Sequence, residues 1–351
     1  MDFSFSEDQK MFQETLREFL SAEHAADKVR ELWDSETRRS SELWQQLCEI
    51  GIMGLLVPEE YDGMGMDEVD LVLCLEEMGT HAFAEPVVPT LVGTRLLADL
   101  ADKSLAQEWL PKVAGGEAIL AVQNPESPFV QDAHVADLLI LQNDGELHAV
   151  TSDQVKLTAQ ESNDPSNCLF TVDWTPSADT LIAKGEEAAT LSAEAFDRGA
   201  LAAAAQLVGC GQRMIHMACE YANERKQFGV LIGTFQAIKH MCSNAQVEVE
   251  YSRPVVYRAA FSVANNTANR SVNVSMAKLA AAEAAHTAGR VSMQVHGGQG
   301  YTWEQDLHLW MRRAWSLDLA WGSKQMHSQR IADVVIDQGV PTATLGESWL
   351  A

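Results

Sequence analysis

The chain has 351 residues, of which 46% are hydrophobic, and it carries a formal net charge of -25 at pH 7. This length and apolar content suffice for a buried core, so the composition excludes an intrinsically disordered chain. Nucleic acids and anionic membranes bind clustered Lys and Arg side chains, and we therefore expect the acidic chain to bind neither.

Residues 1–116 are predicted to be helical. The stretch SEDQKMFQETLREFLSAEHA places its apolar residues on one face of a helix, and Ser6 followed by acidic residues is a helix start signal. Further helical patterns end at Gly51, near Gly79 and at Gly115–Gly116. We expect an N-terminal helical domain over this part of the chain.

From residue 117 the pattern changes to short strands. Segments such as ADLLILQ, VKLTA and CLFTVDW are rich in Val, Leu, Ile and Thr, and Asn, Asp, Pro and Gly separate them. They predict a small β domain over residues 117–188, of a size that needs packing against helices to be stable.

Helical patterns return from Ala189. A long Ala-rich stretch is followed by two more helices and by a last one, TWEQDLHLWMRRAWSLDLAWGSKQMHSQRIADVV. Long antiparallel helices with short connections predict a four-helix bundle over residues 189–351, and the small side chains allow close helix packing. The fold class is therefore mainly α with a small β insert.

The cysteines and the N-terminus indicate the compartment. None of the six cysteines forms a CxxC pair, so we expect buried, reduced thiols and no metal site. The N-terminus MDFSFSEDQK lacks the basic-then-apolar order of a signal peptide. No apolar run approaches the roughly 18 residues that span a bilayer. We expect a cytoplasmic protein without a membrane span.

Two stretches at the ends of bundle helices carry the chemistry. ERKQFGVLIGTFQAIKH places Arg225, whose guanidinium suits a phosphate, before a helix break at Phe228–Gly229. QVHGGQGYTWE contains Gly297 and Gly298, where the missing Cβ lets the main chain approach a ligand. Taken alone, the first stretch is equally consistent with a charged helix end and a packed Phe.

Together with MRRA, the two stretches resemble those of the acyl-CoA dehydrogenases, and the resemblance covers nearly the whole chain. It implies an N-terminal helical domain, a middle β domain and a C-terminal four-helix bundle, with FAD at a dimer interface. It also implies contacts to the FAD of a neighbouring subunit. These are Arg225, Gln227 and Phe228 at the diphosphate, Gln236 at the adenosine end, and Gln294, Gly297 and Gly298 along the adenine and ribose phosphate. Ser323 and Gln325 match positions that also touch flavin in relatives.

The resemblance fails at the catalytic base. The dehydrogenation needs a carboxylate that removes a proton from the thioester α-carbon while a hydride leaves the β-carbon for the flavin. Most relatives carry this Glu directly before a Gly-Thr or Gly-Ser pair, where this chain has Trp321; a minority carry it on the first bundle helix, where this chain has Gly199. Neither residue can accept a proton. Asp318 and Asp197 remain open as substitute bases.

The middle domain departs from the resemblance as well. The stretch AVQNPESPFVQDAHVADLLIL keeps a trace of the family's acidic-Pro-small-Gly-Ser segment. The Trp-Ile-Thr-Asn-like strand that packs on the flavin in relatives is absent, and the domain is shortened. The chain therefore keeps the elements that reach a neighbour's flavin and lacks those that hold its own.

This combination is similar to the short subunits of α2β2 enzymes that desaturate CoA esters of steroid side chains. It implies a heterotetramer in which a homologous full-length subunit supplies the catalytic Glu and most of the acyl-CoA pocket, and an electron-transfer flavoprotein or similar acceptor takes the electrons. Trp321 would fill the space that the base and acyl chain occupy in relatives. Two alternatives stay open: a self-sufficient homotetramer with a displaced carboxylate base, and a structural or regulatory protein without chemistry.

Overall fold

The computed structural model describes residues 4–337, which divide into two compact units. Asp27–Leu71 and Ala84–Gly199 form one unit, called the mixed unit because it holds helices and both larger sheets. The other, called the bundle unit, contains Val72–Phe83, the residues before Asp27 and all residues from Ala200. The predicted domain limits at residues 116 and 188 stay predictions.

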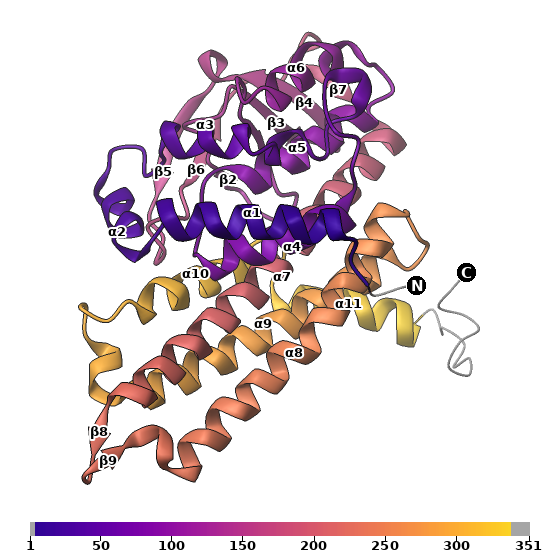
Figure 1. Cartoon of the computed structure of the whole chain (residues 1–351). Coiled ribbons are helices and arrows are strands. Elements are labelled where there is room, and N and C mark those ends of the chain that lie inside the picture. The colour runs from indigo at the N-terminus through magenta and orange to yellow at the C-terminus, as the bar shows by residue number, and fades with distance from the viewer. Residues whose placement is uncertain (1–3, 338–351) are drawn as a thin grey trace. The chain divides into compact units, whose positions relative to one another are not determined.

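The bundle unit consists of helices and one short hairpin (Figure 1). Its helices are α1 (Glu7–Glu23), the second parts of α4 (Glu68–Thr80) and α7 (Gly185–Glu224), α8 (Gln236–Ala264), α9 (Arg270–His296), α10 (Leu307–Leu319) and α11 (Lys324–Ala332). The predicted start of α1 is confirmed, because the Ser6 hydroxyl accepts a hydrogen bond from the backbone N–H of Gln9. None of the described helices is long and apolar enough to cross a membrane.

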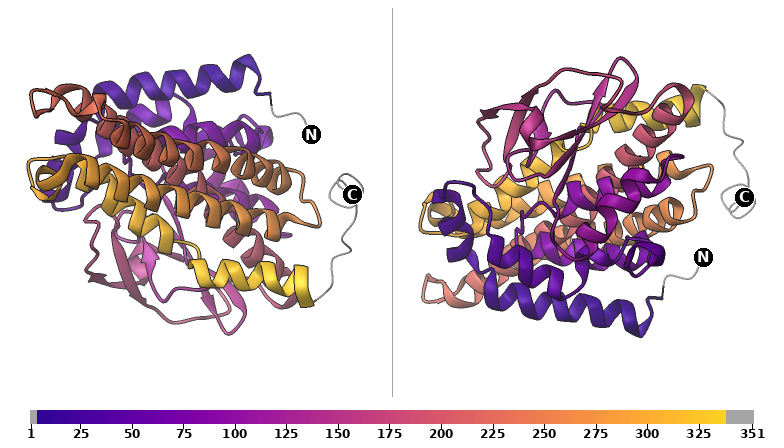
Figure 2. Two further views of the ribbon diagram at one scale, coloured as in Figure 1. Left: turned by 90° about the horizontal axis from the view of Figure 1, so that it is seen from below. Right: turned by 90° about the horizontal axis from the view of Figure 1, so that it is seen from above.

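The long C-terminal helices pack side by side, as predicted. α8 and α9 run alongside each other in both views of Figure 2, and α9 also contacts α10 and α11. Gly211 of α7 faces both α8 and α9, since a Cβ there would lie 3.1 Å from Val249 and 3.5 Å from Ala285. The Ala-rich sequence thus forms the expected helical bundle.

Glycines bring two helices of this unit into backbone contact. A Cβ built on Gly79 of α4 would lie 2.0 Å from the carbonyl oxygen of Gln206 in α7. A Cβ on Gly209 of α7 would lie 1.9 Å from the carbonyl oxygen of Glu76 in α4. Only glycine fits at either position, so the close packing inferred from the small side chains is confirmed here.

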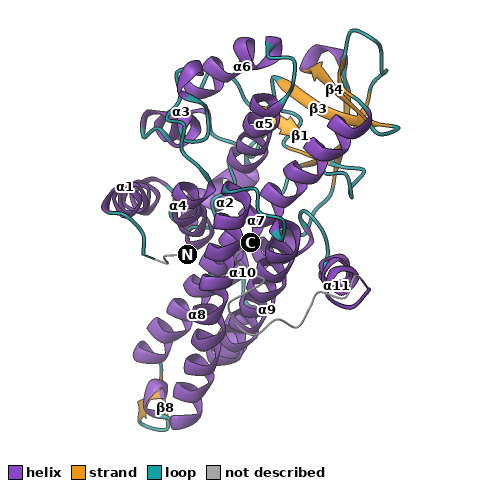
Figure 3. Ribbon diagram, turned by 90° about the vertical axis from the view of Figure 1, so that its right-hand side faces the viewer, coloured by secondary structure: helices purple, strands orange, loops and turns teal. Residues whose placement is uncertain are grey.

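The mixed unit holds the small β insert (Figure 3). Besides the first parts of α4 and α7, its helices and strands are α2 (Ala26–Asp34), α3 (Ser41–Glu49), α5 (Val87–Asp99), α6 (Ser104–Ala114), β1 (Leu120–Val122), β2 (Val130–Gln131), β3 (Leu138–Asn143), β4 (Glu146–Thr151), β5 (Lys156–Gln160), β6 (Leu169–Asp173) and β7 (Leu181–Ala183). One sheet has the order β1-β3-β4-β7 and the other the order β2-β6-β5. β1 is parallel to β3, and the remaining pairs are antiparallel.

The last predicted helix is wrong as a single element. α10 ends at Leu319 and α11 begins at Lys324, with the segment 320–323 between them. Trp321 and Gly322 have φ values of 55° and 103°, which lie in the left-handed region that a right-handed helix excludes. The break falls at Trp321, the residue that the sequence predicts to replace the catalytic Glu of relatives.

Candidate functional site

One end of the bundle unit, called the hairpin end, brings the two predicted motifs together. β8 (Lys226–Gln227) pairs with β9 (Val230–Leu231) around the turn Phe228–Gly229. A small core beneath this hairpin contains Ala222 of α7, Ile232, Cys242 of α8 and Val295 of α9. The core therefore joins the ends of three helices, and the glycine motif lies beside the arginine motif.

Tyr221 and His296 fix the two motifs to each other. The Tyr221 ring stacks on the His296 imidazole with centroids 4.6 Å apart, and its hydroxyl donates to Oε1 of Gln299 at 3.1 Å. His296 is buried, and its Nδ1 donates to the Ser292 carbonyl oxygen at 2.7 Å. Burial lowers the pKa of this imidazole, which favours its neutral form.

The predicted contact residues at the hairpin end face outward. The Arg225 side chain is exposed and has no hydrogen-bond partner among the described residues, and the Phe228 ring is 91% exposed. A Cβ added to Gly297 or Gly298 would meet nothing within 4 Å. Gln227, Gln236 and Gln294 are exposed as well. The surface thus presents a guanidinium, side-chain amides and accessible glycine backbone to a ligand.

The predicted base position lies elsewhere in the bundle unit, in a segment called the Trp321 loop, residues 320–323. The Trp321 side chain is buried at 5% exposure, and its backbone is left-handed. Ser323 is the N-cap of α11, and its hydroxyl accepts from the Met326 N–H at 3.3 Å. The Trp321 indole has no basic lone pair and cannot accept a proton.

The two substitute carboxylates are both committed to their surroundings. Oδ2 of Asp318 lies 3.0 Å from Nε2 of His286 on α9. Asp197 has no exposed surface within α7, and Gly199, which follows on the same helix, is buried. The catalytic use of either Asp stays a prediction.

The predicted cofactor contacts fall into two groups. Gly322 lies against Lys278 near the start of α9, whereas Gly297 caps the end of the same helix. At 1.5 Å per residue, these two points are about 28 Å apart along α9. Ser323 and Gln325 therefore lie far from the hairpin-end residues of the same chain.

The sequence did not single out Lys278, which holds the Trp321 loop together with His327. Lys278 Nζ donates to the carbonyl oxygens of Asp318 at 2.9 Å and Gly322 at 3.3 Å. His327 Nε2 lies 2.9 Å from the carbonyl oxygen of Trp321. A lysine inside the apolar run VSMAKLAAAEAA is the one sequence signal that pointed to such a role.

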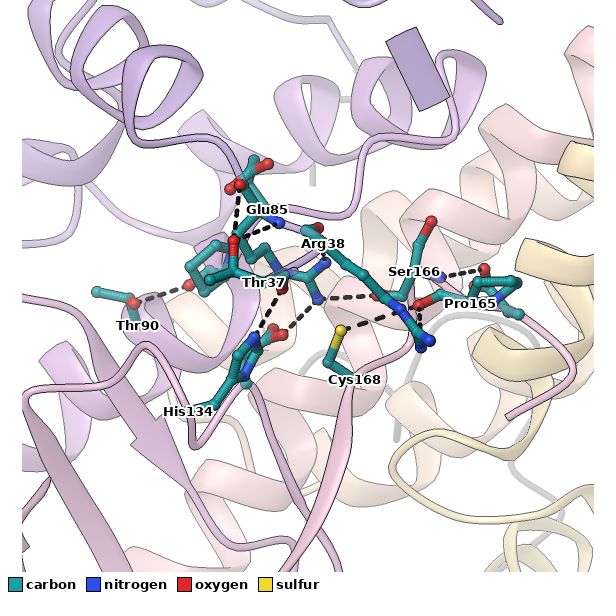
Figure 4. A network of polar contacts seen from close by, with 12 residues as sticks. Thr37, Arg38, Glu85, Thr90, His134, Pro165, Ser166 and Cys168 are labelled. Carbon is teal, nitrogen blue, oxygen red and sulfur yellow. Dashed lines mark hydrogen bonds and ion pairs between the residues drawn. The ribbon is translucent and has the colours of Figure 1, made fainter. Parts of the chain in front are cut away.

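The mixed unit contains a buried polar network, shown in Figure 4. Arg39 pairs with Asp132, and its Nη2 also donates to the Ser166 carbonyl oxygen at 2.8 Å. Nearby, Glu85 Oε1 accepts from the Ser40 N–H at 3.0 Å, and burial raises the pKa of Glu85 to about 7. These contacts fasten the loop before α3 to the β insert.

A cavity of about 1120 Å³ lies in the bundle unit among α1, α4, α7 and α8. Four of the charged side chains in its walls already pair with one another, because Arg253 Nε lies 2.8 Å from Glu76 and Arg17 Nη2 lies 2.6 Å from Glu77. The described residues also contain no cluster of three or more His, Cys, Asp or Glu side chains that could hold a metal ion. The hairpin end and the Trp321 loop thus remain the candidate sites.

Comparison with known proteins gives both family and fold. Residues 6–117 match the family model described as "Acyl-CoA dehydrogenase, N-terminal domain". Residues 189–336 match the one described as "Acyl-CoA dehydrogenase, C-terminal domain". The chain is 31% identical over 310 residues to acyl-CoA dehydrogenase IpdE2 of Mycobacterium tuberculosis, covering 88% of this chain and 91% of the relative.

Solved structures agree in fold. The ChsE4-ChsE5 complex from Mycobacterium tuberculosis contains a chain that superposes with a TM-score of 0.86 at 24% identity, covering 97% of this chain and 100% of that one. The Tcur3481-Tcur3483 steroid ACAD gives a TM-score of 0.84 at 22% identity, covering 95% and 98%. The predicted mainly α fold with a small β insert is therefore confirmed.

Proposed function

Because this chain belongs to the acyl-CoA dehydrogenase family, we propose that it is the base-less subunit of an FAD-dependent enzyme that desaturates an acyl-CoA thioester. A homologous full-length subunit would supply the catalytic Glu and most of the substrate pocket. The observation that carries this proposal is Trp321, which stands at the base position with a buried indole that cannot accept a proton.

The residues at the hairpin end fit the outer part of an FAD held by a neighbouring subunit. A diphosphate needs a fixed positive group, and the exposed Arg225 guanidinium has no competing hydrogen-bond partner among the described residues. Exposed amides of Gln227, Gln236 and Gln294 can bond adenosine, and the open backbone at Gly297 and Gly298 allows a ribose phosphate to come close. When bound, FAD supplies the hydride acceptor.

Ser323 and Gln325 would serve a second flavin-facing surface. They lie about 28 Å along α9 from the hairpin end, farther than one diphosphate and its nearest groups extend. We infer that the two groups of residues face different cofactor sites of an oligomer. The hairpin end of this chain then contacts the FAD of its neighbour, and the Trp321 loop fills the active-site position of this chain, which has no base.

The names of two structural relatives support a proposal for the assembly and the substrate. One of the superposing structures is a ChsE4-ChsE5 complex, and another is described as a steroid ACAD. We therefore propose a cytoplasmic heterotetramer that acts on a steroid side-chain CoA ester and passes electrons to an electron-transfer flavoprotein or similar acceptor. This chain contributes no catalytic residue of its own.

Purification alone and with the full-length partner tests the proposal. We expect the chain alone to lack flavin absorbance and to leave acyl-CoA unoxidised, whereas the co-expressed complex should be yellow and active with a dye acceptor. Activity of the lone chain would contradict the proposal and favour a homotetramer. Absence of flavin in the complex as well would favour a structural or regulatory role.

The homotetramer is the second candidate, and one observation favours it. Oδ1 of Asp318 is buried and has no hydrogen-bond partner, three residues before the family's base position. A general base needs an oxygen that no other group of the protein engages, and Oδ1 meets this geometric requirement. Substitution of Asp318 therefore separates the two candidates.

A further inference from the structure

The Trp321 loop is held by its backbone carbonyl groups. Lys278 Nζ donates to Asp318 at 2.9 Å, at the end of α10, and to Gly322 at 3.3 Å, within the loop. His327 of α11 bonds the carbonyl oxygen of Trp321, which lies between these two points. Two buried side chains from α9 and α11 thus grip the main chain before, at and after the left-handed residue.

Lys278 occupies a position where a charge is costly without such bonds. Its side chain is 1% exposed, and its α9 neighbours Ala277, Ala281 and Ala282 have no exposed surface. Burial lowers the pKa of its ammonium to about 8. The ammonium points at the carboxyl end of α10, where the helix dipole is negative, and this placement offsets part of the desolvation cost.

His327 has a defined protonation pattern. A carbonyl oxygen can only accept, so Nε2 must carry the hydrogen that it donates to Trp321. The ring has no exposed surface, and Nδ1 lies 3.1 Å from the Ser275 hydroxyl on α9. The imidazole therefore bridges α9 and the loop.

We propose that Lys278 and His327 are positioning residues that hold the Trp321 loop in one conformation with the indole buried. The predicted base position is then rigid and filled by the Trp321 side chain. The inference rests on the proposed function only in identifying the loop as the base position. The grip on the carbonyls explains how a tryptophan persists at φ 55°, a conformation that costs a bulky residue free energy. The same grip would hold whichever side chain stands at position 321.

Amide hydrogen exchange on the full chain tests the proposal without partner or flavin. We compare wild type with Lys278→Met, which keeps an unbranched side chain one heavy atom shorter and removes the donor. The control is Lys324→Met. Lys324 is the first residue of α11 and so lies directly after the loop, but its ammonium pairs with Glu283 at 2.9 Å on the surface and does not bond the loop carbonyls. Exchange in peptides covering residues 316–328 should rise roughly tenfold or more for Lys278→Met and stay unchanged for the control.

A conservative pair at His327 provides the second arm. His327→Leu removes the donor to Trp321 and should raise exchange in the same peptides, whereas His327→Gln keeps an N–H donor and should restore much of the protection. Peptides of β3 and β4 report on general destabilisation and should not change. If Lys278→Met does not fold, the comparison of His327→Leu with His327→Gln tests the proposal, again by exchange in the loop peptides relative to those of β3 and β4.

Two outcomes overturn the proposal. The first is unchanged loop exchange in both Lys278→Met and His327→Leu. The second is a rise of equal size in the loop and in β3 and β4, which would show a general structural role. Because neither measurement involves FAD, a failure here is distinct from a failure of the proposed function, which the flavin content of the complex decides.

Discussion

Oδ2 of Asp318 lies 3.0 Å from Nε2 of His286, and this contact turns the carboxylate toward α9. The Asp318 side chain is 15% exposed, so its approach to a substrate is narrow. A general base must reach the substrate proton with an unengaged oxygen, and Asp318 has such an oxygen in Oδ1. Because His286 holds Oδ2 and the proposed partner subunit supplies the base, we nevertheless expect Asp318 to be a structural carboxylate beside the Trp321 loop.

Substitution of Asp318 tests this account directly. We expect Asp318→Asn in the co-expressed complex to keep dehydrogenase activity within about twofold, because the amide retains the shape of the carboxylate and the partner provides the base. Turnover should be measured with a dye acceptor at saturating acyl-CoA. A loss of a thousandfold or more would instead identify Asp318 as the base.

The hairpin end should control flavin retention. Arg225→Ala in the complex should weaken FAD binding by about tenfold or more, because the diphosphate loses a charge-assisted donor. The FAD affinity of Arg225→Lys should lie between those of wild type and Arg225→Ala, because an ammonium keeps the charge but lacks the planar array of donors. The FAD-to-protein ratio after gel filtration measures the effect. Lys226→Ala, which removes the same charge one position along, is the control, and equal losses in both variants would count against a specific role for Arg225.

A carboxylate at the base position should not restore activity. Trp321→Glu removes a large buried ring and places a charge in its site, so we expect a loss of unfolding free energy of roughly 3–5 kcal/mol. The lone chain should remain inactive, because the sequence is also predicted to lack the strand that packs on the flavin in relatives. Thermal unfolding and the dye assay measure the two effects, and measurable turnover by the variant alone would refute the proposed division of labour.

The contrast between α1 and the Trp321 loop shows what the sequence can predict. Periodicity and the start signal at Ser6 were sufficient for α1, because both act over a few residues. The break at Trp321 was missed because tryptophan is an ordinary residue within helices, and its left-handed backbone depends on Lys278, which is remote in sequence. Likewise, Arg225 was found through its motif, but its separation from Ser323 emerges only from the length of α9.

Glu85 should make stability depend on pH. Burial raises its pKa from 4.5 to about 7, so the folded state binds a proton between these values that the unfolded state has lost. The unfolding free energy of wild type relative to Glu85→Gln should therefore fall as the pH rises from 4.5 to 7 and stay level above 7. A tenfold change in proton affinity corresponds to about 1.4 kcal/mol, so the total change in unfolding free energy is roughly 3 kcal/mol. Urea unfolding at pH 4.5 and pH 8 tests this, and parallel curves for the two proteins would contradict it.

Contact between α4 and α7 depends on glycine, and a matched pair of substitutions on α7 tests that dependence. A Cβ on Gly209 would fall 1.9 Å from the Glu76 carbonyl oxygen, a backbone atom that cannot move without shifting α4. A Cβ on Gly211 would meet mainly the Val249 side chain at 3.1 Å, which can shift by a few tenths of an ångström. We expect Gly209→Ala to lower the unfolding free energy by about 3 kcal/mol or more, whereas Gly211→Ala should change it by less than about 1 kcal/mol, because alanine also favours the helix. Equal effects in urea unfolding would show that the α4–α7 contact adapts, and that the glycine does not set the distance between the helices.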